Sequence, residues 1–405
     1  MLLNRKIKIY KLNIDSICKS ILMIYICVLF AFYEIRVFVE ALYIIVFFLY
    51  FITRKKGLTL YTLWSLVFVV ICALSNMWSL DLGGSLLGTR AAIEIAIIGN
   101  LLVSYIDSDD KLNYLMTCFV VAGLILVFKM LIIVPINEWG TQRIGNKIYN
   151  ANAIGLYLGF ATIFASYLSM LKKQKHYYVI MCMFFLVILA TGSRKAFLLV
   201  LLGIAALNII KSDKVWKRLI AIPISIFIII IGYQLIMNVP TLYNIIGSRI
   251  ERLIYMFTGL GNVDASTRIR LGMIETGVSL FKLKPFIGHG INSYTVISGY
   301  DTYSHNNYIE LLVGIGLIGT LIYYSIYAHI IIKLAKSCRN RIANVFLIVI
   351  TLLTIIEFGL VSWEGELYQI LIAAAFSTIK FVNIKKNINS NKGRNGLHGT
   401  TRTII

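Results

Sequence analysis

The chain has 405 residues, of which 59% are hydrophobic, and its mean hydropathy is +0.82. A soluble protein of this length could not bury so much apolar surface, so the composition predicts an all-α protein that crosses a membrane many times. The formal net charge of +21 would suit a nucleic-acid binder, but the basic residues stand in short blocks between apolar runs. That pattern is typical of membrane proteins and argues against nucleic acid as a partner.

Apolar runs recur along the whole chain. A helix needs about 20 predominantly apolar residues to cross the hydrocarbon core of a bilayer. A window of this length predicts about 12 transmembrane helices. They lie near residues 17–33, 37–52, 58–74, 86–106, 112–136, 150–171, 177–191, 195–210, 218–237, 306–332, 342–361 and 365–382.

Basic residues in the short loops indicate the orientation, because cytoplasmic loops are enriched in Lys and Arg. With the N-terminus in the cytoplasm, the inside segments include "TRKKG", "KKQKH" and "KSDKVWKR", and we expect both termini in the cytoplasm. The predicted parts are helices 1 to 9 (1–237), a large outward-facing loop (238–305), helices 10 to 12 (306–382) and a polar, disordered cytoplasmic tail (383–405).

The outward-facing loop is too long for a plain connection between two helices. Two parts of it carry apolar residues at helical spacing. They are Leu242, Ile246, Leu253 and Phe257 in the first part, and Leu271, Ile274, Val278 and Phe281 in the second. Amphipathic helices of this kind lie on a membrane surface or cover a cavity. The stretch "KPFIGHGINSY" then predicts a turn-rich return to the membrane.

Several arginines fall on the predicted outer side, where few basic residues are expected. They are Arg143, Arg194, Arg249, Arg268 and Arg270. Contact with lipid head groups explains a single outer arginine. A group of them near helix ends beside one large loop favours an anion site, because a guanidinium contacts phosphate through two parallel hydrogen bonds. We therefore expect an outward-facing site for an anion such as a diphosphate.

Charged residues also occur inside the predicted helices. Arg90 and Glu94 are four residues apart, which favours an ion pair within one helix. Lys129 has no local partner and is expected to face a cavity or a distant carboxylate. Candidates for that carboxylate are Glu357, Glu364 and Glu366, which are alternatively interface residues.

His305, Asn306 and Asn307 stand where the long loop meets the tenth helix. A neutral histidine can accept a proton from a hydroxyl near neutral pH. Asparagine can hydrogen-bond sugar hydroxyls, but it is also a good N-cap. From the residues alone, a catalytic and a structural interpretation both stay open.

The sequence "SHNNYIELLVGIGLIG" resembles the signature of the O-antigen ligase and polymerase superfamily, with His305, Asn306, Gly316 and Gly319 at the matching positions. Upstream segments resemble the family in the same order. They are "QRIGNKIYNANAIG", "LATGSRKAFLLVL" and "ASTRIRLGMIETGVSLFKLKPFIGHGINSY". His289, between two glycines of the last segment, is interpreted as incidental because the pattern there requires only the glycines.

The resemblance implies a glycosyltransferase of the bacterial cytoplasmic (inner) membrane that works at the outer face. Its donor is a polyprenyl-diphosphate-linked oligosaccharide, and neither a metal nor a nucleotide cofactor takes part. By the same resemblance, His305 is the general base. Arg194 and Arg268 hold the diphosphate, and Arg143 is a weaker candidate for this role. Asn152 and Asn306 position substrate. Arg270 joins the candidate substrate-binding residues as part of the outer arginine group.

The resemblance leaves the acceptor open. A polymerase transfers the glycan to another lipid-linked repeat unit in capsule, exopolysaccharide or O-antigen synthesis, whereas a ligase transfers it to a terminal acceptor. We favour the polymerase, with membrane lipid around it and a chain-length regulator and a flippase as candidate partners. The rival from another class is a transporter of lipid-linked glycans. Such proteins often contain internal repeats, and the two halves of this chain show no clear repeat.

Overall fold

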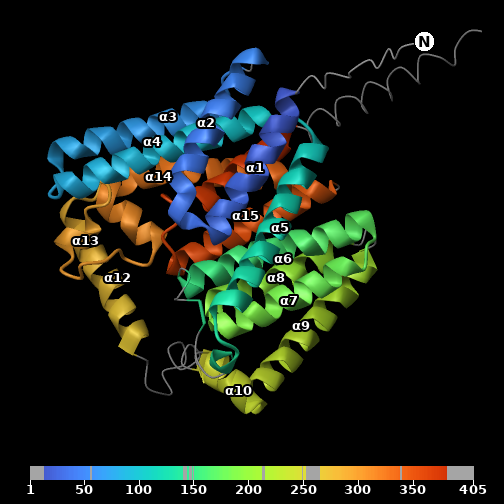
Figure 1. Cartoon of the computed structure of the whole chain (residues 1–405). Coiled ribbons are helices and arrows are strands. Elements are labelled where there is room, and N and C mark those ends of the chain that lie inside the picture. The colour runs from blue at the N-terminus through green and yellow to red at the C-terminus, as the bar shows by residue number, and fades with distance from the viewer. Residues whose placement is uncertain are drawn as a thin grey trace, which may run out of the picture.

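The structure is a computed structural model. It describes residues 13–54, 57–139, 144–145, 148, 150–211, 215–248, 250–251, 265–337 and 340–380. Throughout these residues the regular elements are helices, and Figure 1 shows how they are arranged.

The α-helices in chain order are α1 (Ile14–Ala31), α2 (Arg36–Thr53), α3 (Leu60–Ser75), α4 (Leu82–Tyr105), α5 (Asp109–Ile133), α6 (Ala151–Lys172), α7 (His176–Thr191), α8 (Arg194–Lys211), α9 (Val215–Asn238), α10 (Pro240–Leu242), α12 (Ala265–Leu283), α13 (Tyr294–Ile297), α14 (Asn307–Ala335) and α15 (Arg341–Ile356). Short 3-10 helices span Tyr33–Ile35, Asn76–Trp78, Ile136–Glu138 and Glu357–Gly359, and a π-helix spans Tyr243–Gly247. A further helix covers residues 366–380 and is called the C-terminal helix below.

The prediction of an all-α polytopic membrane protein is confirmed. Each of the predicted apolar ranges coincides with a helix, although the last is described only to residue 380. Within the described residues, 8 helices are long and apolar enough to cross a membrane. The short seventh range forms α7, an apolar helix just below that length. The number of helices that span the membrane stays a prediction.

Polar residues begin many of the helices. The N-caps Asn13, Thr59, Asp81, Ser108, Asn150, Asn306 and Asn340 each accept a hydrogen bond from a backbone N–H in the first turn of the helix that follows. The first N–H groups of a helix have no partner within the helix, and leaving them bare near lipid costs free energy. The polar residues at these N-cap positions therefore satisfy N–H groups that the helices leave unpaired.

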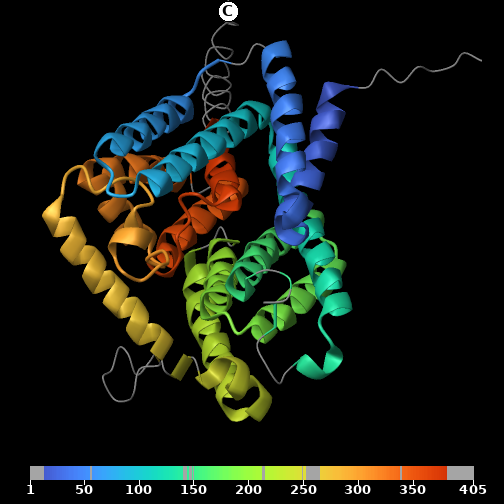
Figure 2. The same cartoon turned by 60° about the vertical axis from the view of Figure 1, so that its left-hand side comes forward.

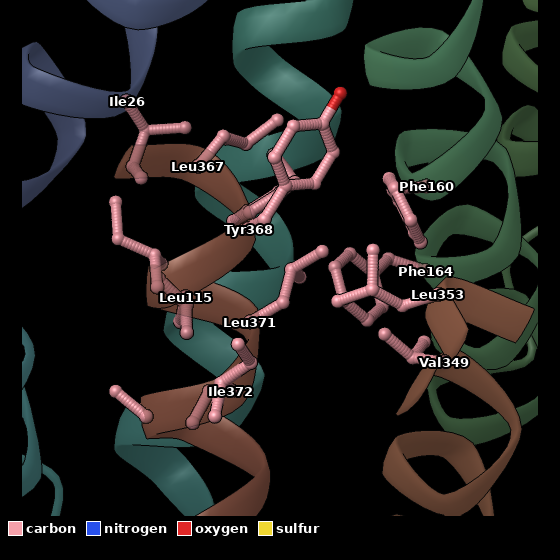
Figure 3. Close-up of a cluster of buried hydrophobic side chains, with 14 of the residues drawn as sticks. Ile26, Leu115, Phe160, Phe164, Val349, Leu353, Leu367, Tyr368, Leu371 and Ile372 are labelled. Atoms are coloured by element: carbon pink, nitrogen blue, oxygen red, sulfur yellow. The ribbon is translucent and has the colours of Figure 1, made fainter. Parts of the chain in front are cut away.

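The core is a continuous layer of apolar side chains between helices that are distant in sequence. Figure 3 shows part of it, where side chains from α1, α5, α6, α15 and the C-terminal helix meet. The labelled residues are Ile26, Leu115, Phe160, Phe164, Val349, Leu353, Leu367, Tyr368, Leu371 and Ile372, and all are buried. Because the C-terminal helix is packed in this way, the loop before it is held in a fixed place.

A broken helix positions the end of the large loop. α14 is interrupted at Gly316, where φ is +66° and ψ is −170°. The loop before α13 is bound to the two parts of α14, on either side of the break, by four backbone hydrogen bonds of 2.8 to 3.3 Å. They join His289 to Val313, Gly290 to Gly314, Leu317 to Pro285 and Ile318 to Phe286. A Cβ at Gly316 would lie 2.4 Å from the backbone of Phe286, so only glycine fits.

α12 forms the described part of the large loop. Figure 2 shows it as a long helix along one side of the molecule, with its C-terminal end beside α14. It coincides with the second predicted amphipathic helix and packs Met273 against Tyr294 and Ile309 in a small separate core. The first predicted amphipathic helix is described only up to Glu251, and the remainder lies outside the described residues.

The charged residues inside the predicted helices have partners. The predicted pair of Arg90 and Glu94 is confirmed, with 2.7 Å between Nε and Oε1. Lys129 donates to the carbonyl of Ala31 at 2.5 Å and lies 3.8 Å from a carboxylate oxygen of Glu34. The distant carboxylate is therefore Glu34 and none of the three expected candidates, because the chain between α1 and α2 passes close to α5.

Candidate functional site

A cavity of about 480 Å³ lies among helix ends that come from most of the chain. The topology predicts that all of these ends face the same outer side. The cavity is lined by Tyr33, Arg36, Ala91, Glu94, Ile95, Asn150, Asn152, Ala153, Leu156, Tyr157, Lys195, Tyr303, His305, Gly359, Leu360, Val361, Glu364, Gly365, Glu366 and Tyr368. Two of the sequence-predicted site residues, His305 and Asn152, meet here although 153 positions separate them.

The backbone around His305 is shaped to present its ring to the cavity. His305 has φ +57°, in the left-handed region that few residues other than glycine adopt. On one side, the Ser304 N–H donates to Glu310 and the Ser304 hydroxyl donates to the carbonyl of Asn306 at 2.8 Å each. The imidazole packs against the ring of Tyr303, with 4.3 Å between centroids.

His305 is held in its neutral form. Burial lowers the pKa of its imidazole, and the positive charges of Arg270 and Lys195 lower it further, to about 4. An ammonium or guanidinium near an imidazole disfavours the protonated ring. At neutral pH the ring is therefore unprotonated and can accept a proton, as a general base must.

The cations around His305 differ in part from those expected. Lys195 lines the cavity at the start of α8 and donates to the carbonyl of Gly359. Arg194 precedes it and is half-buried, but it is not part of the cavity lining. On α12, Arg268 is exposed, whereas Arg270 is half-buried and close enough to act on the His305 pKa.

Two of the outer arginines, Arg143 and Arg249, lie outside the described residues. The expected set of diphosphate ligands is therefore seen only in part. Lys195 was not predicted as a site residue, because the family resemblance concerned Ser193 and Arg194 and not the residue that follows them.

The two asparagines of the motif have structural contacts. The Asn306 side-chain oxygen accepts from the N–H groups of Tyr308 and Ile309 at 3.0 and 3.2 Å, so this residue is the N-cap of α14. Asn307 was expected to hydrogen-bond sugar hydroxyls, but its side-chain oxygen binds the backbone instead. Its side-chain oxygen accepts from Ser362 and Trp363 at 3.0 Å each, which fixes the loop that forms one wall of the cavity.

His289 also has a contact that the sequence did not predict. Its side chain is buried, and Nε2 donates to the carbonyl of Leu280 at 2.8 Å. Its backbone N–H donates to Val313 and its carbonyl accepts from Leu80. The residue interpreted as incidental therefore ties α12 to α14 and to the segment before α4.

No cluster of three or more His, Cys, Asp or Glu side chains that could hold a metal ion occurs in the described part of the chain. Independence from metal stays a prediction implied by the family resemblance.

Comparison with known families gives a match to part of the chain. Residues 178–324 match the family model described as O-antigen ligase, a segment that runs from α7 into α14 and includes His305, Arg194, Arg268 and Arg270. The resemblance to the O-antigen ligase and polymerase superfamily is confirmed over this segment. No curated protein matches the chain. The match supports glycan transfer of the ligase or polymerase type on lipid-linked glycans, and the apolar helices indicate an integral membrane protein.

Proposed function

We propose that this chain is a polysaccharide repeat-unit polymerase of the bacterial cytoplasmic membrane. It transfers a polyprenyl-diphosphate-linked glycan to a hydroxyl of another lipid-linked repeat unit at the outer membrane face, in capsule, exopolysaccharide or O-antigen synthesis. The observation that carries the proposal is a neutral His305 in a cavity that also contains the Lys195 ammonium, with Arg270 near the ring.

The reaction needs one base and one site for the leaving group. His305 accepts the proton of the acceptor hydroxyl while the oxygen attacks the anomeric carbon of the donor sugar. The bond between that carbon and the diphosphate oxygen breaks, and the diphosphate leaves with the bonding electrons. Lys195 and Arg270 stabilise the negative charge on it, and the proton passes from His305 to the leaving group or to water.

Donor binding also strengthens the base. The charges of Arg270 and Lys195 depress the His305 pKa when the cavity holds no anion. A bound diphosphate offsets those charges, so the pKa of the imidazole rises toward its ordinary value. A base whose pKa is nearer to neutral removes a proton more effectively, so proton transfer is favoured once the donor is in place.

A ligase is the second candidate, because the matched family model is described as O-antigen ligase. Purified protein in lipid nanodiscs, given a synthetic polyprenyl-diphosphate oligosaccharide as the only substrate, distinguishes the two. A ladder of products with increasing numbers of repeat units is the expected result. Transfer only after a second, terminal acceptor is added would show a ligase, and no transfer in either reaction would contradict glycan transfer altogether.

A further inference from the structure

One carboxylate in the cavity remains after the ion pairs are assigned. Glu94 pairs with Arg90, and Glu366 accepts from Arg36 at 2.5 Å. Glu364 lines the same cavity and is exposed to it. It forms no hydrogen bond and no ion pair with any residue that the structure describes.

The walls of the cavity partly remove water from Glu364. Burial raises the pKa of its carboxyl group, and no cation among the described residues lowers it. A carboxylate that loses water without gaining a partner raises the free energy of the empty site. A ligand that donates hydrogen bonds to this carboxylate offsets that cost when it binds. An unpaired carboxylate in a cavity therefore indicates a ligand with hydrogen-bond donor groups.

The other lining residues indicate which chemical groups of the ligand donate these hydrogen bonds. Four tyrosines face the cavity, namely Tyr33, Tyr157, Tyr303 and Tyr368. Aromatic rings offer flat apolar surfaces on which the C–H face of a sugar ring can pack, and a carboxylate accepts hydrogen bonds from sugar hydroxyls. A diphosphate has the opposite requirement, because it carries negative charge and is repelled by Glu364.

The charged groups of the cavity act on different neighbours. Arg270 and Lys195 both act on His305, whereas Glu364 is not among the groups that change the His305 pKa. The pKa of Tyr303, raised mainly by burial, is affected by both Arg270 and Glu364. His305 therefore lies near both cations, and Tyr303 lies near Arg270 and near the unpaired carboxylate of Glu364.

We propose that Glu364 binds the acceptor glycan, accepting hydrogen bonds from hydroxyls of the acceptor sugar while the tyrosines pack against its ring. The inference rests on the proposed glycan transfer and adds the residue that recognises the acceptor. Recognition by hydroxyl groups explains why a cavity that contains the Lys195 ammonium also contains an unpaired carboxylate.

The test separates acceptor binding from donor binding. The donor is the lipid-linked oligosaccharide extracted from cells that lack this protein, and the acceptor is the same oligosaccharide released from its lipid and labelled with a fluorophore. Transfer rates are measured in nanodiscs against acceptor concentration at saturating donor, and then against donor concentration. Glu364→Gln should raise the KM for the acceptor by about 10-fold to 100-fold, the range expected for a hydrogen bond to a charged group, with the KM for the donor unchanged.

Two further variants complete the comparison. Glu364→Asp keeps the charge but withdraws it by one methylene, and should give an intermediate KM for the acceptor. Glu275→Gln removes an exposed carboxylate of α12 outside the cavity, and should change neither KM. An unchanged KM for the acceptor in Glu364→Gln, or a rise only in the KM for the donor, would overturn the inference and leave the proposed function standing. Absence of transfer by the unmodified protein would instead overturn the proposed function.

Discussion

Glu310 holds the backbone of Ser304 through a hydrogen bond of 2.8 Å, across the turn that carries His305. Glu310 is buried in the first turn of α14, so the helix itself fixes the position of the residue before the base. The left-handed conformation of His305 is costly for a side chain with a Cβ, and it persists only because neighbouring contacts determine it. The direction of the imidazole therefore depends on a residue outside the cavity lining.

Glu310→Ala should lower the transfer rate without abolishing donor binding. The variant leaves the Ser304 N–H buried and unpaired, which costs about 1–3 kcal/mol, and releases the turn that presents the base. Glu310→Gln keeps an acceptor oxygen and should retain most of the rate. Initial transfer rates and melting temperatures of both variants check this. A full rate in Glu310→Ala would show that the turn is positioned by other contacts.

His305→Gln tests the base directly. Glutamine can hydrogen-bond a sugar hydroxyl but cannot take its proton at neutral pH, so the transfer rate should fall by about 10²-fold to 10⁴-fold. Expression and the lipid-linked donor pool should be unaffected. The measurement is consumption of lipid-linked donor in membranes. A rate near that of the unmodified protein would show that His305 binds substrate and does not act as the base.

The pH dependence follows from the lowered His305 pKa. Only the neutral ring accepts a proton, so kcat/KM should be constant near neutral pH and fall as the pH drops toward about 4. Removing a positive charge raises the imidazole pKa, so Arg270→Gln should move this fall to higher pH. Arg268→Gln, an exposed residue on the same helix, is the matched control and should leave the profile in place. Identical shifts in both variants would contradict a specific effect of Arg270.

The helices could be predicted from the sequence because each depends on a local property. An apolar run of sufficient length forms a helix in a membrane whatever its neighbours are, so the predicted ranges coincide with the helices. The pair of Arg90 and Glu94 was predictable for the same reason, since both residues lie on one helix. The partner of Lys129 was not, because the contact with Glu34 depends on how α5 packs beside the α1–α2 turn.

In the candidate site, too, residues within short motifs were predictable and residues brought in by tertiary packing were not. His305 and Asn152 were predicted from short motifs, and the structure brings them to one cavity. Arg36 and Glu364 were not predicted as site residues, because they lie outside the motifs and reach the cavity only through tertiary packing. Asn307 stands within the motif, but its role depends on a loop that begins 52 positions later in the sequence, at Gly359.

Gly316→Ala tests whether the motif glycine is structural. The residue has φ +66°, and an added Cβ would lie 2.4 Å from backbone atoms of Phe286, which cannot move without breaking the hydrogen bonds between the loop and α14. A left-handed conformation alone costs a residue with a Cβ about 1–3 kcal/mol, so the variant should melt at a clearly lower temperature and lose transfer activity with it. Gly232→Ala in α9 is the control, because no atom lies within 4 Å of its added Cβ and alanine is favoured in a helix. Thermal unfolding in nanodiscs, followed together with the transfer rate, distinguishes the outcomes. If Gly316→Ala kept the melting temperature of the unmodified protein but lost activity, the glycine would serve the reaction directly, and its role in joining the loop to the broken helix would be wrong.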